Sequence, residues 1–155
     1  MTDPPHACDR GSPIRADLVE YLIVAVGDVD GLATVGEALA RLVDEGTVRI
    51  LDLVALVRHA DGEVAVWEPE ATPGLEDLIA PDARRQLLST RDIERASAAL
   101  RPGSAGVVVV TEDRWAEPLS TAARLAGGRI VAGDRIPPDR IEATLLHHLD
   151  EREES

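Results

Sequence analysis

Short, continuous apolar runs alternate along this chain with segments in which apolar residues recur every three or four positions. The runs at 21–26 (YLIVAV) and 104–110 (SAGVVVV) are rich in β-branched residues, which predicts buried strands. A third run at 47–57 is followed by the turn ADG and by alternating residues at 63–67, which predicts a β-hairpin. The shorter run RIVAG at 129–133 predicts one more strand, so that about five are expected.

Helical spacing occurs at 32–46, 89–102, 114–126 and 137–149. Asp28 or Asp30 can cap the first of these helices, and Ser89 with Asp92 forms a capping-box pattern at the start of the second. Residues 69–88 are less regular and are interrupted by prolines. The last helix is expected to turn three apolar residues toward the core: Ile141, Leu145 and Leu149.

The order of these elements begins β-α-β-β-α-β, which predicts an α/β (α+β) fold with a ferredoxin-like split βαβ sheet. Its helices are expected mainly on one face, with the C-terminal helix appended. We expect a disordered tail at 1–17, a single domain at 18–149 and an acidic tail at 150–155. The strand at 47–57 is apolar on both faces, so its second face is also expected to be covered. A homodimer packed through the open sheet face, or the C-terminal helix folding back, could cover it.

Composition excludes several kinds of partner. The chain has 16 basic residues, all of them Arg, against 29 acidic residues, for a net charge of -13. This balance opposes binding to nucleic acid and to anionic lipid surfaces, and without Lys no Schiff-base chemistry is possible. Only three residues are aromatic, too few for a base-stacking platform: Tyr21, Trp67 and Trp115.

The sequence also predicts a cytoplasmic protein. No apolar run approaches the roughly 20 residues that a membrane span needs, so no membrane association is expected. The N-terminus lacks a basic segment followed by an apolar one, so we expect no secretory signal. Cys8 is the only cysteine, which excludes an internal disulfide.

Several stretches resemble the bacterial domain-of-unknown-function families 6325 and 1269. They are GTVRILDLVALVRHADGEV, LSTRDIERASAALRPGSAGVVVV, TEDRWAEPL and AGGRIVAGDRIPPD, within roughly Glu20 to Leu146. The resemblance implies a small ferredoxin-like α/β domain without an established activity, and it supplies no catalytic residues. Some relatives in the wider group carry a glycine-rich membrane-inserting segment in the middle of the chain. This sequence has the polar, proline-interrupted stretch 69–88 there instead, which argues against a membrane role.

Asp52 is the first candidate for chemistry, because it lies inside the apolar run RILDLVAL, in phase with Ile50 and Val54. A buried carboxylate is costly unless it is paired or protonated, so Asp52 could be a general base or a ligand anchor. The structural alternative is an acid that pairs with Arg or caps neighbouring backbone, or a bulge that turns the side chain outward.

A second group of candidates follows the run VVVV, where a strand is expected to lead into a helix. Glu112, Arg114 and Trp115 lie there, and such strand ends often line ligand sites. Arg114 could hold an anion and Trp115 could stack on a ligand. The structural alternative is that Asp113 caps the helix while Trp115 packs beneath the sheet.

Neither a metal site nor a cofactor is predicted. His147 and His148 are adjacent on the last predicted helix and diverge by about 100°, so they cannot chelate one ion together. The segment GDVDG lacks the later acidic ligands of a calcium loop. Phosphate-binding loops and nucleophile elbows are also missing from the sequence.

Three functions remain open, and enzymatic activity is uncertain. The first is a non-catalytic, oligomerising regulatory or interaction module. The second is a small-molecule-binding or enzymatic protein of the dimeric α+β-barrel type, in which Asp52 acts with Arg114 or Trp115. The third is an accessory subunit of a larger assembly whose acidic termini bind a basic partner.

Overall fold

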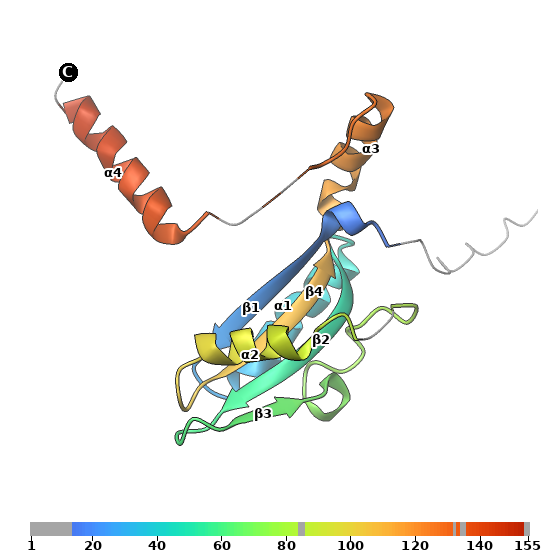
Figure 1. The fold of residues 1–155 in the computed structure, drawn as a ribbon, viewed down its shortest axis with the longest axis vertical. Coiled ribbons are helices and arrows are strands. Elements are labelled where there is room, and N and C mark those ends of the chain that lie inside the picture. The colour runs from blue at the N-terminus through green and yellow to red at the C-terminus, as the bar shows by residue number, and fades with distance from the viewer. Residues whose placement is uncertain (1–13, 84–85, 132, 134–135, 154–155) are drawn as a thin grey trace, which may run out of the picture.

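Four antiparallel strands form one sheet in the computed structural model, which describes residues 14–83, 86–131, 133 and 136–153 (Figure 1). The strands are β1 (Val19–Val26), β2 (Arg49–Arg58), β3 (Val64–Trp67) and β4 (Ala105–Glu112). The helices are α1 (Gly31–Asp44), α2 (Thr90–Ala99), α3 (Glu117–Leu125) and α4 (Pro138–Glu153). Short 3-10 turns are η1 (Ala16–Leu18), η2 (Pro69–Ala71) and η3 (Arg114–Ala116).

The strand order is β1-β4-β2-β3, with every neighbouring pair antiparallel. Because β1 and β2 both run antiparallel to β4, they are parallel to each other and β4 is inserted between them. Likewise, β3 and β4 both run antiparallel to β2, so they are parallel to each other with β2 inserted between them. The structure confirms a mixed α/β fold with two split crossover units, but it does not confirm a ferredoxin-like sheet.

Helices cover both faces of this sheet, so the prediction that they lie mainly on one face is wrong. Leu32 and Leu39 of α1 pack with Ile50, Leu53 and other core residues on one face. Ala96 and Leu100 pack with Val54, Leu56 and Val108 on the opposite face. In Figure 1, α2 lies in front of the strands and α1 behind them. The two-sided apolar pattern of β2 is therefore explained within one chain.

A β-bulge in β2 changes which residues share a face. The register against β4 shifts between Ile50 and Asp52, so Leu51 is an extra residue in the strand. Ile50 consequently belongs to the α1 face, whereas Asp52 and Val54 lie on the α2 face. The prediction that Asp52 is in phase with Val54 is correct, but the predicted alignment with Ile50 is wrong.

Several local signals in the sequence have the expected structures. Ser89 and Asp92 form the complete capping box at the start of α2. The carboxylate of Asp28 accepts the backbone N–H of Gly31 at 3.2 Å, so Asp28 serves the start of α1. The β2–β3 hairpin turns through Gly62, whose φ of 91° favours glycine.

The C-terminal quarter departs from the prediction. Arg129–Val131 and Gly133, the described residues of the expected fifth strand, do not form one. Helix α4 lies away from the sheet (Figure 1). Ile141, Leu145 and Leu149 are therefore 43%, 59% and 59% exposed, and the prediction that they face inward is wrong. We call residues 129–131, 133 and 136–153 the C-terminal arm.

Candidate functional site

Asp52 is buried where β2 approaches the segment that leads into α2. One carboxylate oxygen accepts the backbone N–H of Leu53 at 2.9 Å, and the other accepts the backbone N–H of Leu88 at 3.0 Å. The second bond joins positions 36 residues apart, so Asp52 fixes the chain entering α2 to the sheet. A small hollow beside it is lined by residues that include Glu68, Gln86 and Ile93. This geometry matches the structural alternative, since the acid caps neighbouring backbone at a bulge.

Glu112 lies at the end of β4 and is also buried. Its Oε2 accepts the backbone N–H of Arg15 at 2.8 Å and the guanidinium Nη2 of Arg49 at 2.9 Å. Arg49 is directly opposite Glu112 in the sheet register and also reaches Asp82 at 3.6 Å. A buried carboxylate with a charged and a backbone donor is electrostatically satisfied, so Glu112 joins three distant segments of the chain.

A second polar cluster fastens α3 to the N-terminal segment. The hydroxyl of Ser120 donates to Asp17 at 2.6 Å, and Arg124 forms an ion pair with the same carboxylate at 3.7 Å. The hydrogen bond from Ser120 is the main reason that the pKa of Asp17 lies below its ordinary value of 3.8. The ionised carboxylate therefore holds the base of α3.

Asp113 does not cap a helix through its side chain, in contrast to the structural alternative above. Its carboxylate instead accepts the hydroxyl of Thr111 at 2.9 Å, while its backbone N–H donates to Leu18 at 2.7 Å. These bonds close the end of β4 against η1.

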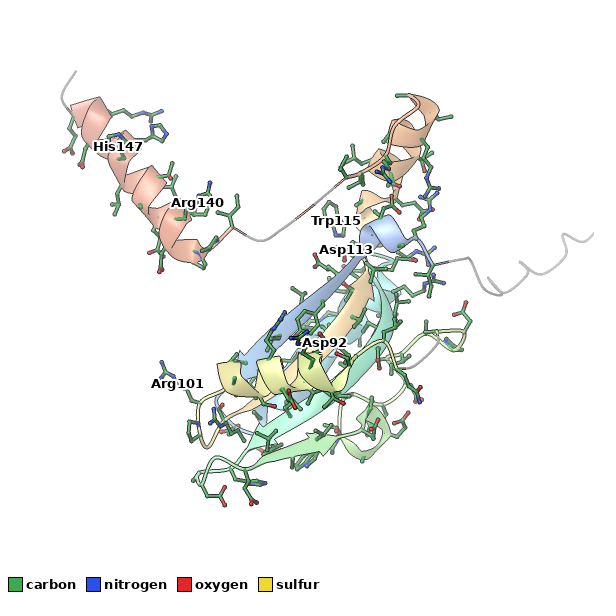
Figure 2. The ribbon with its side chains drawn as sticks, in the orientation of Figure 1. Asp92, Arg101, Asp113, Trp115, Arg140 and His147 are labelled. Atoms are coloured by element: carbon green, nitrogen blue, oxygen red, sulfur yellow. The ribbon has the colours of Figure 1, made fainter. Side chains whose placement is uncertain are left out.

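Trp115 is exposed, and the expectation that it packs beneath the sheet is wrong. Its side chain is 65% exposed at the junction of the sheet with α3 (Figure 2). The backbone N–H of Trp115 donates to Thr47 at 3.1 Å, which fixes the main chain and leaves the indole outside. Trp115 lines a groove of about 600 Å³, together with parts of η1 and β1 and the apolar residues Leu119 and Ile130. We call this the β1 groove.

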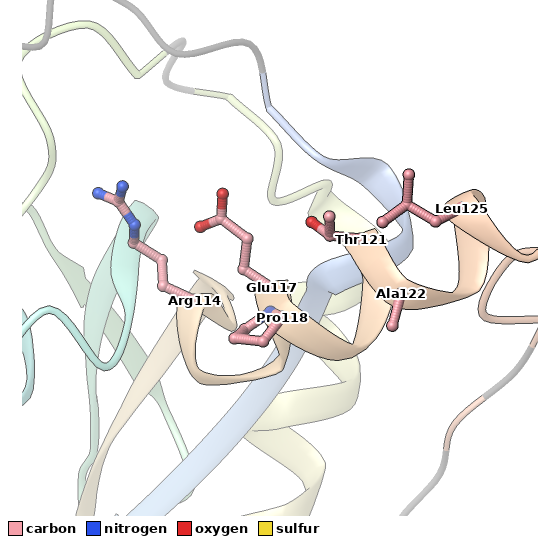
Figure 3. A pocket seen from close by; sticks show the side chains of 6 residues that line it. All are labelled: Arg114, Glu117, Pro118, Thr121, Ala122 and Leu125. Carbon is pink, nitrogen blue, oxygen red and sulfur yellow. The ribbon is translucent and has the colours of Figure 1, made fainter.

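Arg114 lines a different, open depression on α3. Figure 3 shows Arg114, Glu117, Thr121 and Leu125 projecting from the same side of η3 and α3. The chain thus offers Arg114 at one surface, Trp115 at the β1 groove and Asp52 beside α2. These are three separate hollows, so the structure does not bring the predicted residues into one site.

Sequence reasoning missed Arg15, Arg49, Asp17 and Ser120, which hold the two polar clusters together. The partners of Glu112 are 97 and 63 residues away along the chain, and those of Asp17 are similarly remote. The run at 47–57 placed Arg49 in a predicted strand, but it did not reveal which residue of β4 lies opposite.

Within the described part of the chain, no group of three or more His, Cys, Asp or Glu side chains is arranged to hold a metal ion. None of the helices described there combines the length and the apolar character needed to cross a membrane.

Comparison with known proteins gives one result at the level of the family. The profile described as "Family of unknown function (DUF6325)" matches residues 15–154, nearly the whole chain. The chain belongs to this family. No curated protein matches it, and no solved structure does. Membership confirms the part of the sequence resemblance that concerns family 6325. The matched range begins at Arg15, whose backbone N–H contacts the buried Glu112.

Proposed function

We propose that this member of DUF6325 is a non-catalytic regulatory or interaction module that works by self-association. The observation that carries the proposal is the uneven distribution of exposed apolar side chains. Fifteen large apolar residues are exposed in the described part, and nine of them lie at or after Trp115. Exposed apolar surface concentrated in one region marks a site of protein contact.

The apolar residues of α4 support a packing role for the C-terminal arm. Ile141, Leu145 and Leu149 follow one another at four-residue spacing, which puts them on one face of the helix. An isolated helix of this kind is only marginally stable in water, because helices in proteins are stabilised mainly by packing of the apolar face. A partner surface would supply that packing.

The candidate acids support a non-catalytic role. The carboxylates of Asp52 and Glu112 each accept two hydrogen bonds from donors of the chain itself. Loss of either carboxylate would leave donors of the chain without their acceptor, so both acids act in holding the fold together. A catalytic acid, in contrast, needs a reacting group within hydrogen-bond reach. With its single cysteine, the chain also suits a reducing compartment, and we propose a cytoplasmic location.

Introducing negative charge on the apolar face of α4 tests the proposal. The double variant Leu145→Glu/Leu149→Glu should raise the dissociation constant for self-association at least about tenfold, because it would bury two carboxylates in an apolar contact. The matched control is Val29→Glu/Leu42→Glu, which adds the same charge at exposed apolar positions outside the arm. Light scattering after size exclusion gives the mass of each variant. Equal association of the two variants would contradict a role for the arm.

A further inference from the structure

Among the strands that the structure describes, β1 has a hydrogen-bonding neighbour on one side only. All eight of its residues pair with β4, and β1 is the first strand in the sheet order. In an antiparallel strand, alternate residues direct their N–H and C=O groups toward opposite sides. No strand among the described residues pairs with the outer side, so β1 presents a row of backbone donors and acceptors there.

The sequence and the register of β1 lack several features that usually protect an edge strand. Its sequence VEYLIVAV contains no proline and one charged residue, Glu20. The register with β4 runs through all eight positions without a bulge. The opposite edge strand, β3, is only four residues long, and short edges resist pairing. β1 is therefore better suited than β3 to pair with another strand.

We propose that β1 pairs antiparallel with β1 of a second copy, which extends the sheet across a two-fold axis. This proposal rests on the proposed function and names the surface through which the chain self-associates. A two-fold axis perpendicular to the sheet keeps each face continuous, so opposed residues must point to the same face. The axis then passes between the two copies of one residue, either Leu22 or Ile23, at the middle of the strand.

The residues of β1 are compatible with this symmetry. With the axis at Ile23, Tyr21 lies opposite Ala25 and Leu22 lies opposite Val24. Glu20 faces Val26 in that register and Val24 in the register centred on Leu22. Neither arrangement opposes two like charges, and each pairs apolar residues across the strands.

The C-terminal arm adds a second reason to choose a copy of this chain as the partner. In Figure 1, α4 lies beyond the β1 edge of the sheet, on the side away from β3. A copy paired through β1 would occupy that side, within reach of the arm. Backbone pairing alone buries little surface, whereas stable interfaces bury about 800 Å² per partner. The apolar side chains of the arm and of the β1 groove can supply the remainder.

Cysteine cross-linking of the full chain tests the pairing. In a Cys8→Ser background, Leu22→Cys and Ile23→Cys are introduced one at a time, and Val66→Cys on β3 is the edge-strand control. A residue on the axis faces its own copy with Cα atoms about 5 Å apart, which suits a disulfide. Mild oxidation should give a covalent dimer as the main product for one of the two β1 variants, and little for Val66→Cys.

Hydrogen exchange provides a measurement that needs no substitution. Deuterium uptake in 19–26 should slow as the unmodified chain passes from monomer to dimer with rising concentration. If the chain sediments as a dimer but the β1 variants do not cross-link and uptake in β1 is unchanged, the pairing is wrong and self-association stands. If the unmodified chain stays monomeric at tens of micromolar, the proposed function fails together with this inference.

Discussion

Asp52 stabilises the junction between β2 and the segment that enters α2. Its two carboxylate oxygens satisfy the backbone N–H groups of Leu53 and Leu88 in a buried environment. An acid with this role contributes to the fold by preventing two donors from losing their hydrogen bonds.

Replacement of Asp52 should therefore lower the free energy of unfolding. Asp52→Ala removes both acceptors and is expected to cost about 1–3 kcal/mol, measured by urea denaturation. Asp61→Ala is the control, because Asp61 also accepts a backbone N–H, from Glu63, but at an exposed position where water can replace it. Equal losses for the two variants would contradict a structural role that depends on burial.

At this scale, the sequence predicts local contacts and not remote ones. Ser89 and Asp92 are three residues apart, so their capping box could be predicted from spacing alone. The bond from Leu88 to Asp52 and the ion pair of Arg49 with Glu112 depend on the register of β2 against β4. That register includes a bulge, and no periodicity in the sequence indicates its position.

Helix α1 lies unusually close to the loop that follows η2. A Cβ atom built on Gly36 would lie 2.1 Å from the carbonyl oxygen of Gly74, which is shorter than any real contact. The facing Gly74 has a φ of 89°, so both positions of this contact need glycine for different reasons.

Gly36→Ala should consequently destabilise the protein even though alanine favours helices. We expect the free energy of unfolding to fall by about 1–3 kcal/mol, because backbone must move to relieve the overlap. Gly27→Ala is the matched control, since a Cβ there has no atom within 4 Å. A thermal melt of both variants measures the difference. Gly36→Ala with an unchanged melting temperature would show that α1 and the loop are not in contact.

Attachment of α3 depends on an ionised Asp17. Its pKa is lowered mainly by the hydroxyl of Ser120, so the attachment is present at neutral pH and is lost as pH falls through the lowered pKa, below 3.8. Ser120→Ala should raise the pKa of Asp17 toward 3.8, as measured by NMR titration of its carboxyl carbon. Asp92, whose pKa is lowered by Ser89, should not respond. An unshifted Asp17 would contradict the hydrogen bond.

At the scale of elements, prediction was best where apolar residues pack within the sheet and its two covering helices. The strands β1, β2, β3 and β4 and the helices α1 and α2 all occur near their expected positions. The periodicity could not say that α2 covers the face opposite α1. It also wrongly predicted a strand that includes 129–131. A strand needs a neighbouring strand to pair with, and apolar composition alone does not show whether one is present.

The whole molecule combines a well-packed sheet with a C-terminal quarter that has little to pack against. Both sheet faces are covered, so self-association through a bare face is not needed to bury β2. Among the described residues, β1 has no neighbouring strand on its outer side, and nine of the fifteen exposed large apolar residues lie at or after Trp115. Pairing at β1 would satisfy the outer backbone groups of that strand, and contact at the apolar residues would remove their surface from water.

Sedimentation velocity of the unmodified full chain, over a dilution series from about 0.1 to 50 µM, tests the central claim most directly. Specific associations of interface size commonly have dissociation constants at or below the micromolar range, so we expect a species with twice the mass of one chain at the upper end. We also expect it to dissociate on dilution. A single species with the mass of one chain throughout the series would contradict self-association as the function of this protein.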